Sequence, residues 1–270
     1  RLEQLHNFCV ENYNKGSDKK RRIDLWMESQ LNEIIRDTIH FMEQTLYRSA
    51  SQRCFFDLQR AVKWYMNRCG DKPNKNLMNK IIESQLIMLS PFCPFVCEET
   101  WELIGKQSFI SLEKWPSIDK NKILENIDSE EKLVENVMED IRNLLKLIKV
   151  DAKRVTLFVS EEWKYDLYDL LGELIDFSDK IDVKKVTSEI MKVETLKKHG
   201  QEVMGIVNKI IKNRVIPKSV DREVEYNVLI DARDFLEDEF NVDIEVVYAE
   251  DSKEQKAKQA LPAKPAILIG

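Results

Sequence analysis

The spacing of apolar residues over the first hundred positions constrains the fold more than any other feature. From Leu2 to Gly105 apolar side chains recur every three or four residues, and short polar connectors interrupt them. This spacing is typical of amphipathic helices packed into a bundle. The helices predicted from it cover Arg22 to Tyr47, Ser51 to Cys69, Asn76 to Leu89 and Phe95 to Ile104.

Proline and glycine mark where the predicted bundle turns. Pro91 and Pro94 lie in the run Ser-Pro-Phe-Cys-Pro, and proline cannot continue a helix, so a tight corner is expected there. Gly105 follows the last apolar residue of the next segment, which is the usual place for a helix-ending glycine. The segment from Gln107 to Asn126 reads as irregular.

The second half of the sequence predicts a different architecture. Asp128 and Glu131 have the spacing of a capping pair at the start of a long helix. Alternating strands and helices follow, which suits a small mixed sheet with helices on one face. The expected strands are Arg154–Val159, Glu223–Ile230, Val242–Tyr248 and Ala266–Ile269, and the expected helices are Glu161–Leu171, one or two within Asp182–Arg214, and Asp231–Phe240. The fold class is therefore a mainly α helical bundle, residues 1–118, followed by a small α+β domain, residues 119–270.

Charge and composition exclude few functions. The formal net charge is −6, with 17 Lys and Arg against 15 Asp and Glu in residues 1–118 and 25 against 33 in the remainder. Any nucleic-acid contact must therefore come from local basic patches.

No stretch reaches the roughly 18 apolar residues of a membrane span, so no membrane partner is expected. The odd number of cysteines, 5, indicates a reducing compartment, and the initial Arg suggests a piece of a longer polypeptide.

No arrangement of residues resembles an active site. There is no glycine-rich phosphate loop, and His6, His40 and His199 lie far apart without obvious partners. Cys93 and Cys97 could share a metal ion with a second ligand pair, but none has a convincing spacing. We therefore interpret the two cysteines as small buried hydrophobic residues and expect no metal and no catalytic residue in this chain.

Two groups of basic residues could contact a polyanion. Arg53, Arg60 and Lys63 fall on an arc opposite the apolar side of their helix, if each residue turns it by about 100°. The pattern alone favours an ordinary solvated face. The run from Lys19 to Arg22 is likewise interpreted as a solvated loop, although four adjacent positive charges could meet phosphates.

The most specific signal is the run LIMLSPFCPFVCEETWELIGKQSFISLEKWP at 86–116. It resembles the end of the anticodon-binding domain of class Ia aminoacyl-tRNA synthetases, and short matches upstream extend the resemblance over most of residues 20–118. The segments IRNLLKLIKVDAKRVTLFVSEEWKYDLYDL at 141–170 and KQALPAKPAILIG at 258–270 resemble the C-terminal domain of archaeal and eukaryotic cytosolic leucyl-tRNA synthetases.

The resemblance implies a non-catalytic, tRNA-binding part of a cytoplasmic leucine-tRNA ligase. Such a part would position leucine tRNA, which has a long variable arm, for aminoacylation by N-terminal catalytic and editing domains of the same polypeptide. ATP and Mg²⁺ would serve the parent enzyme, whose His-Ile-Gly-His-like and Lys-Met-Ser-Lys-Ser-like signatures do not occur here, and this chain would hold no cofactor.

The resemblance also implies which residues contact the tRNA. In the family, the loop before the first strand of the C-terminal domain approaches the tip of the variable arm. The corresponding residues here include Lys149, Val150, Asp151, Lys153 and Arg154. The end of the chain, Pro265 to Ile269, is a weaker candidate. Arg53, Arg60 and Lys63 would face a tRNA stem.

Three alternatives remain open. The chain could be the same region of an isoleucyl- or valyl-type class Ia synthetase. It could instead be a helical protein-interaction module without RNA binding, which the acidic second half favours and which predicts salt-insensitive binding. An independent catalyst in the α+β domain would require titratable groups clustered in a pocket.

Overall fold

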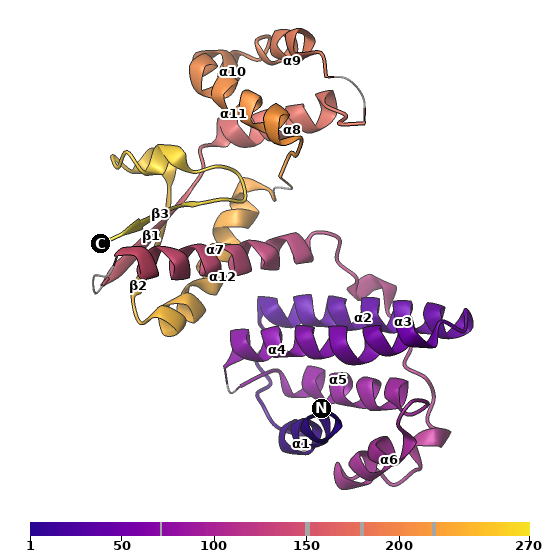
Figure 1. Cartoon of the computed structure of the whole chain (residues 1–270). Coiled ribbons are helices and arrows are strands. Elements are labelled where there is room, and N and C mark those ends of the chain that lie inside the picture. Colours follow the sequence, from indigo (N-terminus) through magenta and orange to yellow (C-terminus); the bar gives the residue numbers. More distant parts are fainter. Residues whose placement is uncertain (71, 149–151, 179–180, 218–219) are drawn as a thin grey trace. The chain divides into compact units, whose positions relative to one another are not determined.

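The computed structural model describes residues 1–70, 72–148, 152–178, 181–217 and 220–270. The chain forms two compact units, Arg1–Asp128 and Ser129–Gly270 (Figure 1). The first unit extends past residue 118 because the following segment packs on the bundle. There, the backbone N–H of Asp119 donates to Asn32 (2.8 Å) and that of Leu124 to Ser29 (3.0 Å).

The first unit is a helical bundle, as the sequence predicts. Figure 1 shows α2 beside α4, with α5, α1 and α6 following across the bundle. Its helices are α1 (Leu2–Asn12), α2 (Arg22–Glu43), α3 (Tyr47–Ser51), the π-helical η1 (Gln52–Asp57), α4 (Leu58–Cys69), α5 (Lys75–Leu89) and α6 (Pro94–Leu103), with short 3₁₀ turns η2 (Ile110–Leu112) and η3 (Lys120–Lys122).

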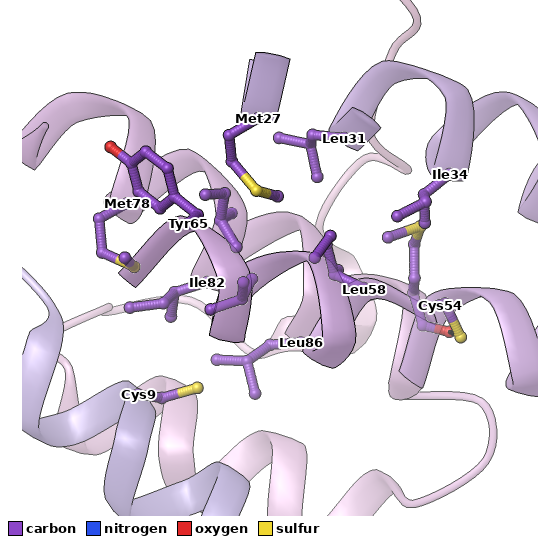
Figure 2. Packing of buried hydrophobic residues seen from close by; sticks show 14 of the residues in the cluster. Cys9, Met27, Leu31, Ile34, Cys54, Leu58, Tyr65, Met78, Ile82 and Leu86 are labelled. Atoms are coloured by element: carbon purple, nitrogen blue, oxygen red, sulfur yellow. Dashed lines mark hydrogen bonds between the residues drawn. The ribbon is translucent and has the colours of Figure 1, made fainter. Parts of the chain in front are cut away.

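Apolar side chains from α1, α2, α4 and α5 fill the centre of this bundle (Figure 2). Met27 and Leu31 of α2 are fully buried, as are Ile82 and Leu86 of α5. The buried Tyr65 has polar partners as well as apolar ones. Its hydroxyl donates to Asp24 Oδ1 (2.6 Å) and accepts from the backbone N–H of Asn74 (2.9 Å).

The proline corner before α6 and the glycine after it have the predicted geometry. Pro94 is the first residue of α6, and Cys93 precedes it as the N-cap in a non-helical conformation. Gly105 has φ +91°, and its N–H bonds to the carbonyl of Glu102 (2.9 Å), while the next N–H, of Lys106, bonds to Trp101 (3.2 Å). These two bonds define a Schellman ending, which glycine favours because it adopts positive φ without strain.

The predicted helix from Ser51 to Cys69 begins differently. Gln52–Asp57 is π-helical and α-helix continues from Leu58. A π-helix closes i to i+5 hydrogen bonds and has a wider turn. The projection at about 100° per residue therefore fails across this segment. Arg53 and Arg60, on either side of this change in helix type, both contact the carboxylate of Asp57.

The second unit contains the predicted mixed sheet. β1 (Arg154–Val159) lies between β2 (Asp243–Tyr248), which is parallel to it, and β3 (Ala266–Ile269), which is antiparallel. Arg154 pairs with Asp243, and Val155 pairs with both Ile244 and Ile269. The helices of this unit are α7 (Ile127–Ile148, whose first two residues lie in the first unit), α8 (Glu162–Leu174), α9 (Val183–Ile190), α10 (Glu194–Lys198), α11 (Gly200–Asn213) and α12 (Arg222–Phe240), with 3₁₀ turns η4 (Ala249–Asp251) and η5 (Ala257–Gln259).

One predicted strand is wrong. Glu223 to Ile230 belongs to α12, although Val224, Tyr226 and Val228 alternate with polar residues as in a strand. The carboxylate of Asp221 accepts hydrogen bonds from the N–H groups of the second and third helical residues and starts a helix there. The buried residues of α12 then follow helical spacing: Glu225, Val228, Leu229, Ala232 and Leu236.

Between β1 and α12 the structure contains a helical cluster with its own core. The segment from Asp182 to Arg214, predicted as one or two helices, holds three, α9 to α11, which pack with α8 (Figure 1). Their buried residues include Leu167, Ile190, Leu196 and Val207. His199 stacks on Trp163 in this cluster, with ring centroids 4.4 Å apart.

Buried polar contacts attach the segment before β3 to α8 and α12. Lys164 Nζ donates to the carbonyls of Lys258 and Ala260, each at 2.8 Å. Glu225 Oε2 accepts from Tyr165 Oη (2.8 Å) and from the backbone N–H of Ala263 (2.8 Å). These contacts hold residues 258–263, which lead toward β3, against α8 and α12. In the part of the chain that the structure describes, no helix is long and apolar enough to cross a membrane.

Candidate nucleic-acid interface

Charged side chains of α2, η1 and α4 alternate in sign across the surface of the first unit. Arg36 Nη2 lies 2.9 Å from Asp37 Oδ1, and Asp37 Oδ2 lies 2.9 Å from Arg53 Nη2. Arg53 Nη1 then reaches Asp57 Oδ2 at 3.5 Å, and Asp57 Oδ1 lies 3.7 Å from Arg60 Nη1. We call these five residues the arginine ladder. Three guanidinium groups share two carboxylates, and Glu33 of α2 lies close enough for the charges of Arg36 and Arg53 to act on its carboxyl.

The two ends of the arginine ladder differ from its centre in exposure. The side chain of Arg60 is 77% exposed and that of Arg36 is 49% exposed, whereas Arg53 is 23% exposed between two carboxylates. Arg53, one of the predicted contact residues, joins η1 to α2 through its ion pair with Asp37. Arg36 of α2 is the second well-exposed arginine of the arginine ladder, and no sequence pattern distinguished it.

Lys63 extends the basic surface along α4. It lies one turn beyond Arg60 and is exposed. Within the described ranges Lys63 has no ion pair, so its charge is open to a partner. Arg60 and Lys63 therefore lie on one exposed helix face, as predicted.

The basic run from Lys19 to Arg22 is held close to the far end of α4. Arg21 Nη1 donates to the carbonyl of Cys69 (3.1 Å), and the carbonyl of Lys19 accepts from Asn74 Nδ2 (3.2 Å). Lys19 and Lys20 are exposed. The run thus leads into the first residue of α2 and carries two outward lysines.

In the second unit, the two predicted contact segments come together. The N–H groups of Lys153 and Arg154 both donate to the carbonyl of Gly270, at 3.0 and 3.2 Å, and the N–H of Gly270 donates to Arg154 O at 2.9 Å. The N–H of Asp243 donates to the carbonyl of Lys153 at 2.9 Å. The start of β1 and the end of β3 are therefore neighbours.

The residues on either side of positions 149–151 form what we call the entry surface: Lys146, Leu147, Ile148, Lys153 and Arg154. Lys146, Leu147 and Lys153 are exposed, with Leu147 76% exposed although it is apolar. Arg154 is 63% exposed and approaches Glu245 at 3.9 Å, a distance at which an exposed pair is weak. The predicted contacts Lys149, Val150 and Asp151 lie outside the described residues.

A buried carboxyl group supports the strand that borders the entry surface. Glu225 is fully buried, and burial raises the pKa of its carboxyl to about 7. The hydrogen bonds that the carboxyl accepts from Ala263 and Tyr165 act in the opposite direction and lower this pKa. Among the residues that the structure describes, its second oxygen, Oε1, finds no hydrogen-bond partner. Sequence reasoning missed Glu225 because an acidic residue in a segment read as a strand gives no sign of burial.

No catalytic constellation is apparent among these groups. Across the described residues no three side chains of His, Cys, Asp or Glu are placed to hold a metal ion. His6 Nδ1 lies 2.8 Å from Thr100 Oγ1, so it is a bundle contact between α1 and α6.

Positive charge at the arginine ladder and at the entry surface suits phosphate groups, which arginine and lysine contact without reading sequence.

Comparison with known proteins gives one family match. A family model described as the anticodon-binding domain of tRNA ligase matches residues 24–160. The leucine–tRNA ligase of Pyrococcus horikoshii is 34% identical over 273 aligned residues, which cover 100% of this chain and 27% of that protein. That of Pyrococcus furiosus is 36% identical over 251 residues (92% and 25%), and that of Aeropyrum pernix is 31% identical over 268 residues (98% and 27%).

The chain thus spans 25–27% of the length of these relatives. A solved ternary complex of Agrobacterium radiobacter K84 agnB2 LeuRS with tRNA and LeuAMS has a TM-score of 0.37 at 18% identity, over 46% of this chain and 16% of that one. A likeness at that score carries no argument.

Proposed function

Because this chain belongs to the anticodon-binding domain family of tRNA ligases, we propose that it is the tRNA-binding part of a leucine–tRNA ligase. The observation that carries the proposal is the extent of the alignments. Relatives named leucine–tRNA ligase align with up to 100% of the chain, including the second unit beyond the family match at residue 160.

In this proposal the bundle contacts the phosphate backbone of a tRNA stem. Arg36, Arg60 and Lys63 supply exposed positive charges, and Asp37 and Asp57 hold the arginines of the arginine ladder in place. Each cation that neutralises a phosphate releases a counterion, so affinity falls as salt rises. Such contacts set the position of the tRNA and do not select its sequence.

The second unit would supply selectivity for the tRNA of leucine. The entry surface combines two lysines and an arginine with exposed apolar side chains, a composition suited to phosphates and to an unstacked base. Lys149, Val150 and Asp151 are part of the proposed contact. The long variable arm is the proposed target, which a short-armed tRNA lacks.

The chemistry would belong to the rest of the ligase. Leucine activation with ATP and Mg²⁺, and editing, are assigned in this proposal to catalytic and editing domains of the same polypeptide, acting in the cytoplasm. This chain would bind no cofactor itself. Its contribution to the reaction is to hold the tRNA so that the acceptor end reaches the catalytic domain.

The test is binding of the purified chain to three transcripts at two salt concentrations: a leucine tRNA, the same tRNA with its variable arm trimmed, and a short-armed valine tRNA. We expect the leucine tRNA to bind tightest, trimming to weaken binding at least several-fold, and affinity to fall with salt. Equal affinity for all three would refute the variable-arm assignment, and the region would fit an isoleucyl- or valyl-type enzyme equally well.

Variants of α4 test the bundle contact separately. Replacing both Arg60 and Lys63 with Ala should lower the slope of log affinity against log salt by about 1.5, because each phosphate contact contributes roughly 0.7 to 0.9. The matched control is the double replacement of Lys197 and Lys209, two exposed lysines of the helical cluster. An unchanged slope in the α4 variant would exclude this face as an RNA contact.

The acidic second half favours one other candidate function, a protein-interaction module. Residues 119–270 hold 33 acidic against 25 basic residues, which opposes generic affinity for RNA. In that case no transcript would bind at moderate salt, and both double variants would behave like the unmodified chain.

A further inference from the structure

The five cysteines of the chain fall into two classes. All are free thiols in the described part of the chain; Cys9, Cys54, Cys69 and Cys97 are buried, and Cys93 alone is half-exposed. Nothing in the tRNA-binding proposal uses any of them. The half-exposed thiol is therefore the one that a small reagent in solution reaches first.

Cys93 has a second thiol within contact distance. It is the N-cap of α6, and Cys97 lies one turn later in the same helix. The two Sγ atoms are 3.6 Å apart. A disulfide requires about 2.05 Å, so the sulfur atoms must approach each other by roughly 1.5 Å. Cys93 is the N-cap residue, with φ −142° and ψ 67°. Its thiol donates to the carbonyl of Leu89 (3.6 Å), which leaves the Cys93 sulfur to accept from Cys97.

The two thiols are not chemically equivalent. The hydrogen bond from Cys97 lowers the pKa of Cys93 to about 7, against the opposing effect of burial. The pKa of Cys97 is raised, by that same pairing and by burial. Thiolate is the reactive form of cysteine toward oxidants. Near neutral pH, Cys93 is therefore the nucleophile and Cys97 the thiol that remains protonated.

We propose that Cys93 and Cys97 form a dithiol that hydroperoxides oxidise to a disulfide at the start of α6. The Cys93 thiolate attacks one oxygen of hydrogen peroxide, the O–O bond breaks, and water leaves after protonation, which gives Cys93 sulfenic acid. The Cys97 sulfur then attacks the Cys93 sulfur, the S–O bond breaks and a second water leaves. Two thiols lose two hydrogens and two electrons, and the peroxide is reduced to two waters.

The remaining cysteines serve as internal references. Burial raises the pKa of Cys9 and of Cys54 to about 12 each, and burial raises that of Cys69 as well. These thiols are protonated and shielded at neutral pH. Oxidation of the folded chain should therefore leave them as free thiols.

The experiment is to treat the folded full chain with hydrogen peroxide, alkylate the remaining thiols after denaturation, and map the tryptic peptides by mass. Cys93 and Cys97 share the peptide 81–106, and each other cysteine falls in a different peptide. We expect peptide 81–106 to become about 2 Da lighter and resistant to alkylation until a reductant is added. An unchanged peptide, or a cross-link of Cys93 to Cys9 or Cys54, would overturn the proposal.

Two variants define the order of the steps. In Cys97→Ser the sulfenic acid on Cys93 has no thiol partner, so dimedone should label that variant and leave the oxidised parent chain unlabelled. Cys69→Ser is the matched control and should form the disulfide at the rate of the parent. Equal dimedone labelling of all three proteins would mean that Cys97 takes no part. The mapping of the unmodified chain decides the proposal even if a variant fails to fold.

Discussion

Replacing Glu225 with Gln should change how the stability of the second unit depends on pH. The carboxyl is fully buried, and burial raises its pKa from 4.5 to about 7. Between these values the folded chain keeps a proton that the unfolded chain has released. The stability that the protonated carboxyl confers is therefore fully present below about pH 4.5 and is lost as the pH rises through about 7.

The size of the effect follows from the shift. A displacement of about 2.5 pKa units corresponds to about 3 kcal/mol between acidic and alkaline conditions. Glutamine stays neutral and keeps one oxygen for the hydrogen bonds from Tyr165 and Ala263. The free energy of unfolding of the variant should therefore exceed that of the parent chain by less than about 1 kcal/mol at pH 5 and by up to about 3 kcal/mol at pH 8.

The assay must report on the second unit alone. Urea unfolding at pH 5 and pH 8, followed by pulsed hydrogen exchange and mass analysis of peptides from α12, gives the free energy of unfolding of that unit. Other titrating groups cancel in the difference between variant and parent. Two stability curves that stay parallel from pH 5 to pH 8 would refute the reasoning, because ionisation of Glu225 would then carry no cost.

Three further substitutions test other contacts. Tyr65→Phe removes the hydroxyl that donates to buried Asp24 and should lower the free energy of unfolding of the bundle by about 2 kcal/mol in a urea titration followed by tryptophan fluorescence; a loss below about 0.5 kcal/mol would contradict it. Lys164→Met removes the donor to the Ala260 carbonyl and should speed hydrogen exchange in residues 258–270 at least tenfold, with the bundle unchanged as the control. Arg53→Ala should lower the free energy of unfolding of the bundle by about 1 kcal/mol at low salt and by less at 1 M salt, in the same urea titration. An equal loss at both salt concentrations would show that the ion pairs of Arg53 do not stabilise the bundle.

Local signals in the sequence were sufficient for much of the fold. The three- and four-residue spacing, Pro94 and Gly105 predict helices and boundaries because each acts within a few residues. β1 was predicted with its observed bounds from a short apolar and β-branched run. The strand predicted around Val224 was wrong. Apolar and polar residues alternate there as in a strand, but the cap at Asp221 and the packing of Leu229 and Leu236 favour a helix.

The candidate site was less accessible from sequence, for two physical reasons. The segment Gln52–Asp57 is π-helical rather than α-helical, so the sequence pattern did not predict that Arg53 pairs with Asp37 and Asp57. The tRNA contacts predicted for Arg53, Arg60 and Lys63 stay predictions. The contact between Lys153 and Gly270 depends on strand pairing across the whole second unit, which no local pattern specifies. The predictions for Lys149, Val150 and Asp151 stay untested.

The position of β1 in the middle of its sheet has a consequence for how the second unit folds. Both of its partners, β2 and β3, follow it far along the chain, with the whole α8–α11 cluster in between. Helices form from contacts between residues close in sequence. Pairing of strands that are far apart in sequence first requires the chain between them to close into a loop, which costs conformational entropy. During synthesis, the run Val155 to Val159 therefore emerges with both backbone edges open. Until residues 266–269 arrive, this strand is a template for pairing with other chains, so the last strand to be made is the one that protects the first.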